Sequence, residues 1–395
     1  MADWLQMKIV RLGELSGVED KKDALSEIEI KLRSLNSREA EQQISQNLDI
    51  GPLFTQLTSD DREYVEQVCD VMKTLFSVFE PGEMYRRYPT EVSRLITHQE
   101  SVVRSFVLHE ILSIVSHRQK ISLLLSDISL LVSVVNRIAD DNLNVAKCAI
   151  CIMKEFGKNS SGLQIFYRGE LLRSFARLLG KNDTVTFRVY EVIVDVAKSS
   201  KEALEATAQS GFLNSLFEIL ENEDILLQLN ALEVLTQLAL TEEGLSYLEQ
   251  QDVLRKLVQK IAQANENPLS NLLIPGLMKF FGNVARHWPN EIFSKYPVVV
   301  SALFEVIESG DQAILGVALD TLGFVATSVE GKYALQALGE AMPGALKKIA
   351  EVIQRMPRAL RIRGLNNLAL IFDVQTSEQD NRILSLTKSW FDTLC

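Results

Sequence analysis

Three observations on this 395-residue chain predict an all-α fold built from stacked helical repeats. Apolar or small residues at relative positions 0, 4, 8 and 11 recur eight times, at steps of 39 to 46 residues. Further apolar helical segments lie between successive copies, and the period-2 alternation of half-buried strands is absent. Periods of about 40–47 residues are typical of HEAT and armadillo solenoids. We therefore expect a right-handed armadillo/HEAT-like helical-repeat solenoid of about eight full repeats.

Each copy of the pattern predicts one helix with a single buried stripe, because its four offsets fall within about 80° of arc on an α-helix. We call these helices the signature helices and count offsets from the first stripe residue. The eight stripes are Tyr64/Val68/Met72/Leu75, Val103/Val107/Ile111/Ile114, Val145/Ala149/Met153/Phe156, Val185/Val189/Ile193/Val196, Leu227/Ala231/Leu235/Leu238, Leu273/Leu277/Phe281/Val284, Ile314/Ala318/Leu322/Val325 and Leu360/Gly364/Leu368/Ile371.

The repeats occupy the central part of one continuous predicted solenoid. Residues 1–49 match the repeat poorly and predict an N-terminal helical cap, in which 23–35 is amphipathic and 37–48 is polar. Residues 50–374 contain the repeats. Residues 375–395 predict a partial repeat or C-terminal cap, because no signature helix follows them. That missing helix indicates a truncated form or an improvised cap.

Two further helices are expected in each repeat. One is apolar and ends in Gly, Asn or Asp, which stop helices and favour turns. The other is short and often begins with Ser or Thr followed by Glu, a capping signature. Two long helices and one short one favour the armadillo variant over plain HEAT.

Composition limits the classes of partner and compartment. The net charge is −11, which disfavours nucleic-acid binding and favours a partner with a basic face. Four scattered cysteines indicate a reduced compartment, the cytoplasm or also the nucleus. The first residues lack the apolar core of a signal peptide, and no transmembrane helix is expected.

Motifs that could carry chemistry are explained better by structure. Cys148 and Cys151 have CxxC spacing, but a zinc site needs four ligands and no second pair exists. The pairs 60–61 and 140–141 are adjacent aspartates just before signature helices, where N-terminal capping explains them. We therefore expect no catalytic residue, metal or cofactor.

The strongest functional signal is the face of the signature helices opposite the buried stripe. Offset 6 points nearly away from the stripe and offset 10 lies on its flank. Stacked armadillo repeats line their concave groove with this face, and acidic residues cluster along it here. We hypothesise that the groove receives a basic protein surface. The predicted partner-binding residues are Glu155, Glu191, Asp195, Glu233, Gln237, Lys279, Asn283, Asp320 and Phe324.

The string Phe280-Phe281-Gly282-Asn283 is the sharpest local feature. Phe281 belongs to a buried stripe, and Gly282 permits close approach of a neighbouring helix. Asn283 stands where armadillo proteins often use an asparagine to clamp the backbone of a partner.

These residues carry a resemblance to a known family. The chain resembles an armadillo/HEAT-like family of 26S proteasome non-ATPase regulatory subunits that act as assembly chaperones of the proteasome base. The matching strings are IGPLFTQL (50–57), NLNVAKCAI (142–150), FRVYEVIVDVA (187–197), LLIPGLMKFFGNVA (272–285), SKYPVVVSALFEVIESGDQ (294–312), GVALDTLGFVATSVEGKYALQ (316–336) and TKSWFDTL (387–394). Residues 1–45 match least, and family chains continue past residue 395.

The resemblance implies a non-enzymatic protein that binds the C-terminal domain of one base ATPase subunit. It also implies a module with a neighbouring ATPase and a large non-ATPase scaffold subunit, and a block on docking to the 20S core. A free monomer is expected. The alternatives are an armadillo-type nucleotide-exchange factor for a heat-shock chaperone ATPase and a general protein-binding adaptor. Stimulated nucleotide release would favour the exchange factor, and robust turnover of a common substrate would favour an enzyme.

Overall fold

The computed structural model describes residues 2–34, 48–263, 270–339, 341–373 and 381–392. Every regular element in these ranges is a helix, which confirms the all-α prediction. The chain divides into two compact units, Met1–Thr207 and Ala208–Cys395. The predicted boundaries at residues 49 and 374 are not tested by this division. The predicted polar segment 37–48 lies almost entirely outside the described residues.

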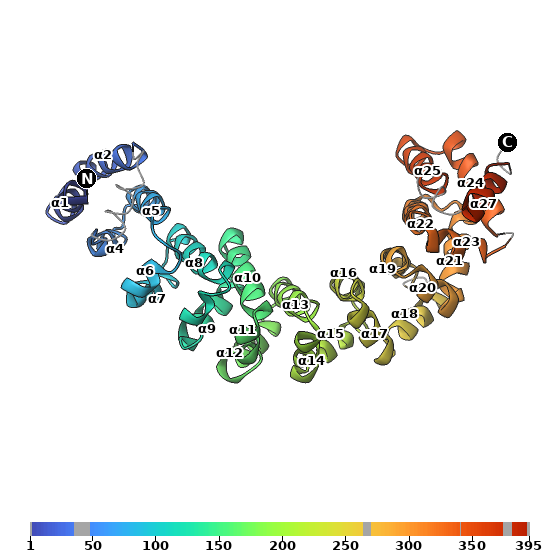
Figure 1. The fold of residues 1–395 in the computed structure, drawn as a ribbon, viewed down its shortest axis with the longest axis horizontal. Coiled ribbons are helices and arrows are strands. Elements are labelled where there is room, and N and C mark those ends of the chain that lie inside the picture. Colours follow the sequence, from blue (N-terminus) through green and yellow to red (C-terminus); the bar gives the residue numbers. More distant parts are fainter. Residues whose placement is uncertain (1, 35–47, 264–269, 340, 374–380, 393–395) are drawn as a thin grey trace. The chain divides into compact units, whose positions relative to one another are not determined.

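The first unit contains four signature helices, each preceded by shorter ones (Figure 1). The signature helices α5, α8, α10 and α13 pack consecutively against one another, and α2 packs on α5. The helices are α1 (Ala2–Leu12), α2 (Val18–Arg33), α4 (Gly51–Gln56), α5 (Arg62–Phe76), α6 (Glu83–Arg87), α7 (Pro89–Leu95), α8 (Ser101–Ser116), the 3-10 helix η1 (Ile121–Leu123), α9 (Ile128–Arg137), α10 (Leu143–Lys158), α11 (Ser160–Phe166), α12 (Gly169–Leu179) and α13 (Asp183–Ala197).

The second unit repeats the arrangement with the signature helices α16, α19, α22 and α25, again packed in succession. The helix α14 (Lys201–Ser210) spans the division between the units. The remaining helices are α15 (Phe212–Ile219), α16 (Ile225–Ala239), α17 (Glu242–Gln250), α18 (Val253–Ala262), η3 (Ser270–Leu273), α19 (Ile274–His287), α20 (Pro289–Lys295), α21 (Pro297–Ser309), α22 (Gln312–Val325), α23 (Val329–Gln336), α24 (Ala341–Arg355), α25 (Arg358–Ile371) and α27 (Asn381–Asp392). Three helices per repeat are confirmed, for example α17, α18 and α19.

The predicted stripes form the core between the helices. All stripe residues are buried except Leu227, Ile314 and Leu368, which are half-buried. Burying a side chain of this size stabilises a fold by about 1.5–3 kcal/mol. The stripes are therefore the main reason why these segments are helical in this place.

Side-chain caps set where several signature helices begin. Asp61 accepts a hydrogen bond from the Tyr64 backbone N–H at 2.8 Å, and Asn182 accepts one from Val185 at 2.9 Å. Each cap satisfies a backbone donor that the first helical turn leaves unpaired. The capping role predicted for the 60–61 pair is thus confirmed at Asp61.

A glycine repeats at offset 17 in three copies, at Gly162, Gly244 and Gly331. A Cβ at any of them would lie 1.8–2.0 Å from the carbonyl oxygen of the last stripe residue of the preceding signature helix. Only glycine permits the short helix to turn so closely under that helix. The sequence interpretation missed this signal, although its spacing is regular.

Candidate functional site

The face opposite the stripes is exposed in both units. We call it the ladder face and define it by offsets 6 and 10 of the signature helices. Offset 6 is exposed in α5, α8, α10, α13, α16, α19 and α25 and half-exposed at Asp320 of α22. The predicted exposure of offset 6 is confirmed within each unit, whereas the concave groove stays a prediction. Whether the predicted residues contact a partner stays a prediction.

In the first unit the ladder carboxylates are paired with lysines. Lys154 Nζ lies 2.6 Å from Glu191, and Lys158 Nζ lies 2.6 Å from Asp195 and 3.4 Å from Glu155. These lysines sit at offsets 9 and 13 of α10, so they reach across to α13. The ladder is therefore a set of ion pairs between neighbouring helices rather than a bare acidic strip.

Asp195 is the most enclosed of these carboxylates. Burial raises its pKa, but hydrogen bonds and charges from Lys158 and Lys198 outweigh burial and hold the pKa below its ordinary value. Lys198 Nζ lies 2.9 Å from the carboxylate. Asp195 is thus ionised at neutral pH and already bonded to two cations, so a partner gains less from it than from Glu191.

The second unit carries fewer ladder ion pairs. Lys279 Nζ lies 2.6 Å from Glu233, and both side chains are more than half exposed. Arg363 lies 3.5 Å from Asp320, whose pKa is raised because burial outweighs that pairing. Phe324, an aromatic residue of the ladder face, is half-buried, and the Arg286 guanidinium lies 5.0 Å from the centroid of its ring.

Three amide side chains on α16 and α19 make no polar contact among the described residues. They are Asn230 at offset 3, and Gln237 and Asn283 at offset 10. An amide offers both donors and acceptors, which suits the backbone of a partner. Of the three, the sequence interpretation included Gln237 and Asn283 and missed Asn230.

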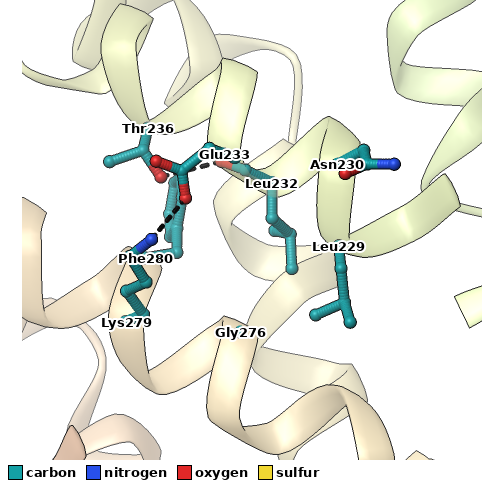
Figure 2. Close-up of a pocket in the computed structure, with 8 residues that line it drawn as sticks. All are labelled: Leu229, Asn230, Leu232, Glu233, Thr236, Gly276, Lys279 and Phe280. Atoms are coloured by element: carbon teal, nitrogen blue, oxygen red, sulfur yellow. Dashed lines mark hydrogen bonds and ion pairs between the residues drawn. The ribbon is translucent and has the colours of Figure 1, made fainter. Parts of the chain in front are cut away.

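A pocket of about 270 Å³ opens between α16 and α19 on this face (Figure 2). It is lined by Leu229, Asn230, Leu232, Glu233, Thr236, Gly276, Lys279 and Phe280. Glu233 and Lys279 were predicted from offset 6, whereas the apolar lining comes from offsets 2, 5 and 7. Those offsets point toward the neighbouring helix, so whether they line a pocket depends on how closely that helix approaches.

The FFGN string is confirmed where the structure tests it. Phe281 is 1% exposed and meets Phe280 edge-on at 5.2 Å between ring centroids. A Cβ at Gly282 would lie 2.3 Å from Thr321 Oγ1, so glycine permits the close approach of α22. The clamping role of Asn283 stays a prediction.

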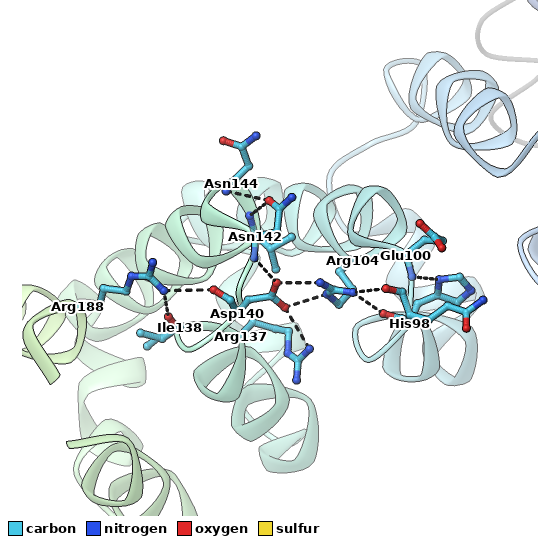
Figure 3. A network of polar contacts seen from close by, with 11 residues as sticks. His98, Glu100, Arg104, Arg137, Ile138, Asp140, Asn142, Asn144 and Arg188 are labelled. Carbon is cyan, nitrogen blue, oxygen red and sulfur yellow. Dashed lines mark hydrogen bonds and ion pairs between the residues drawn. The ribbon is translucent and has the colours of Figure 1, made fainter. Parts of the chain in front are cut away.

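The role predicted for the 140–141 pair is wrong. Asn142 caps α10, accepting hydrogen bonds from the backbone N–H groups of Asn144 and Val145. Asp140 instead binds the Arg104 guanidinium through both oxygens at 2.8 Å (Figure 3). The Asp140 side chain is 3% exposed, so its charge is compensated inside the protein.

Backbone carbonyls extend this polar network. Arg104 also donates to the carbonyl oxygens of His98 and Gln99, at 2.7 Å each. Arg188 donates to the carbonyls of Ile138 and Asp140. The network joins α13 to the turns that precede α8 and α10, and we interpret it as a structural clasp.

The CxxC pair does not form a shared site in the structure. Cys148 is buried and Cys151 is exposed, so the helix separates their side chains into different environments. No group of three or more potential metal ligands occurs among the described residues. In the same ranges no single helix is long and apolar enough to cross a membrane, although one bent pair, Ile314–Val325 with Val329–Gln336, passes by length and composition.

These features define a helical-repeat protein of the armadillo/HEAT class with an exposed ladder face. A solved structure of importin β is similar, with a TM-score of 0.63 and 11% identity over 93% of this chain and 46% of that one. At this identity the likeness shows the fold alone.

The chain belongs to the proteasome non-ATPase 26S subunit family, whose sequence pattern matches residues 1–395. It is 32% identical to the human 26S proteasome non-ATPase regulatory subunit 5, over 97% of this chain and 76% of that protein. It is 34% identical to the Drosophila melanogaster subunit of the same name, over 55% of this chain and 42% of that protein.

Proposed function

We propose that this chain is a non-catalytic assembly chaperone of the 26S proteasome regulatory-particle base. It binds the C-terminal domain of one base ATPase subunit on its ladder face. A neighbouring ATPase and a large non-ATPase scaffold subunit join the same module. The bound chain sterically blocks premature docking of the ATPase on the 20S core.

The observation that carries this proposal is the ladder face on a chain that belongs to the family. Within each unit its signature helices expose charged and amide side chains at the same offsets, and in the second unit an apolar pocket opens between α16 and α19. An exposed face of this kind suits recognition of a folded protein surface. Repeat proteins use such faces for binding, which supports a non-catalytic role.

The ion pairs on the ladder face determine how its charge would act. Exposed pairs such as Lys279–Glu233 contribute at most about 1 kcal/mol to stability, so they can exchange partners at little cost. A basic side chain of the ATPase domain would then compete with Lys279 for Glu233. Charge complementarity of this kind sets orientation and association rate more than affinity.

A binding assay tests the proposal. The purified chain is titrated with the isolated C-terminal domain of each of the six base ATPases. We expect one domain to bind at least about tenfold more tightly than the other five, a difference of about 1.4 kcal/mol. Equal or undetectable binding to all six would contradict the proposal.

A co-sedimentation assay tests whether the chain blocks docking on the 20S core. A base module carrying the selected ATPase is mixed with 20S particles in the presence and absence of the chain. The chain should lower the amount of module that sediments with 20S particles. Unchanged co-sedimentation, at concentrations of chain that saturate the ATPase domain, would contradict blocking. The proposal includes a cytoplasmic or nuclear location, which imaging of a tagged chain tests.

A further inference from the structure

We propose that the pocket between α16 and α19 binds an aliphatic side chain from an extended segment of a protein partner. A lysine or arginine two residues further along that segment would pair with Glu233. This inference deepens the proposed function, because the pocket lies on the ladder face. It nevertheless concerns a peptide chemistry that can be tested without any ATPase.

The pocket has an apolar floor. Leu232 and Phe280 are 2% and 1% exposed, and Leu229 is half-buried at the rim. Figure 2 shows Leu229 and Leu232 pointing from α16 toward the α19 backbone at Gly276. A Cβ at Gly276 would lie 2.3 Å from Leu229 Cδ2, so the glycine lets Leu229 pack directly against the α19 backbone, and a side chain there would displace Leu229.

Exposed apolar groups continue from the pocket. Leu226 is 70% exposed and lies three residues before Leu229, on the same side of α16. Leu272 is 59% exposed and lies in η3, the 3-10 helix that packs against both α16 and α19. Two large exposed leucines on the elements that form or adjoin this pocket favour a partner that covers them, because burial of each would add apolar contact area.

The size of the pocket suits a side chain rather than a small molecule. Small-molecule sites have volumes of about 300–1,000 Å³. At about 270 Å³ this pocket is below that range and is open on one side. It can therefore hold an anchoring side chain, which is how hot-spot residues bind at protein interfaces.

The rim of the pocket favours a cation. Glu233 lies at one end, and Glu223 and Asp224 are exposed at the N-terminal end of α16 beside Leu226. Lys279 is the one basic residue in the lining and already pairs with Glu233. A carboxylate accepts several hydrogen bonds, so Glu233 can hold Lys279 and a second cation together.

The spacing of two residues follows from geometry. Glu233 is four residues after Leu229, which is about 6 Å along the helix axis. Residues i and i+2 of an extended segment project to the same side and are about 6.6–6.8 Å apart. A segment that follows the crevice therefore places its aliphatic residue by Leu229 and its basic residue by Glu233. The unbonded amide of Asn230, the residue after Leu229, also lines the pocket at the Leu229 end and can bond the peptide backbone there.

Peptide titration of the whole chain tests this directly. The chain is labelled at leucine methyl groups, and the signals of Leu229 and Leu232 are followed by NMR. The probes are three blocked pentapeptides, Gly-Leu-Gly-Arg-Gly and its Ser-for-Leu and Glu-for-Arg versions. We expect saturable shifts with the Leu/Arg peptide and at least about fivefold weaker binding of the other two. Absent shifts, or equal shifts with all three peptides, would overturn the inference.

Two variants locate the contact. Glu233→Gln should remove the preference for Arg over Glu and keep the preference for Leu over Ser. Gly276→Ala should weaken binding of the Leu/Arg peptide, because Leu229 must move into the crevice. Gly180→Ala is the matched control, since a Cβ there meets no atom within 4 Å. Unchanged selectivity in Glu233→Gln, with the helical circular dichroism signal intact, would also overturn the inference.

The outcome separates this inference from the proposed function. Selective peptide binding without binding of any ATPase domain would remove the proposed function and leave the pocket assignment standing. Binding of one ATPase domain, with no peptide-induced shift and no effect of Gly276→Ala, would support the proposed function and overturn the pocket assignment.

Discussion

At the scale of single residues, the structure departs from the sequence interpretation where partners are distant in sequence. The position of Asp140 before a stripe predicts a helix cap, but the arginine that binds both of its oxygens, Arg104, is 36 residues away. Lys154 and Lys158, which reach Glu191 and Asp195 from α10, each lie 37 residues from the carboxylate that they pair with. Periodicity identifies which face a residue occupies. It does not identify which cation on the next helix reaches that residue, because side-chain reach and helix spacing decide it.

Removing the charge of Asp140 should destabilise the first unit. Burial raises the pKa of Asp140, but bonds from Arg104 and the Asn142 backbone, with the charge of Arg137, outweigh burial and lower it. Asp140→Asn leaves Arg104 without its buried partner, which costs about 3–5 kcal/mol in such pairs. Chemical denaturation at pH 7 measures the loss, and exposed Asp70→Asn should change stability by less than about 0.5 kcal/mol.

The pH dependence of this clasp follows from the lowered pKa. The stabilisation by Asp140 is present above the unfolded pKa of about 3.9 and is lost as pH falls through the lower folded pKa. The difference in stability between the wild-type chain and Asp140→Asn should therefore shrink only below about pH 4. If the wild-type chain and Asp140→Asn had nearly equal stability at pH 7, that result would contradict a stabilising role of the clasp.

The ionisation of Glu110 should lower the stability of the fold, in contrast to that of Asp140. Burial raises its pKa to about 7, and its carboxylate has no ion pair or side-chain hydrogen bond among the described residues. Because the unfolded chain ionises at lower pH, Glu110 destabilises the fold progressively as pH rises from about 4.3 toward 7. Melting temperatures should show that Glu110→Gln gains stability over the wild-type chain between about pH 5 and pH 8. A constant difference over this range would show that Glu110 is not buried as described.

At the scale of elements, the sequence predicts the signature helices well and their connections less well. Seven of the eight stripes lie on one helix each, and in the sixth the first residue, Leu273, belongs to η3 just before α19. The stripes were predictable because a period of 3.6 residues is a local property of the chain. The offset-17 glycines and the pocket lining were missed because both depend on how closely one helix approaches the next.

Truncating the core of α19 tests the packing of an element. Phe281→Ala should reduce the free energy of unfolding by about 3–5 kcal/mol, because it leaves a cavity next to Phe280 and Tyr296. Leu143→Ala, at a 52% exposed position, is the control and should change little. Hydrogen exchange should show the largest loss of protection in α19 and the helices packed on it. A melting temperature equal to that of the wild-type chain would mean that Phe281 is not a core residue.

At the scale of the whole molecule, the net charge of −11 favours a partner with a basic face. The sequence indicated a strongly acidic binding surface, and the structure shows that lysines compensate much of it locally. What remains for a partner is Glu233 with the pocket beside it, the carboxylate of Glu191 and the unbonded amides. Binding should therefore weaken only moderately with salt, since paired exposed charges contribute little at long range.

The most direct test of the ladder face as the binding surface is charge reversal at Glu191, Asp195 and Glu233 together. The measurement is the affinity for the ATPase C-terminal domain that the wild-type chain selects, at about 50 mM and about 150 mM salt. The control reverses Glu205, Glu218 and Glu243, exposed residues on the shorter helices that give the same change in net charge. We expect the ladder variant to lose at least about tenfold in affinity, most strongly at low salt, and the control to bind as the wild-type chain does. Equal affinity of the ladder variant and the wild-type chain at both salt concentrations, with helical content unchanged, would contradict the account.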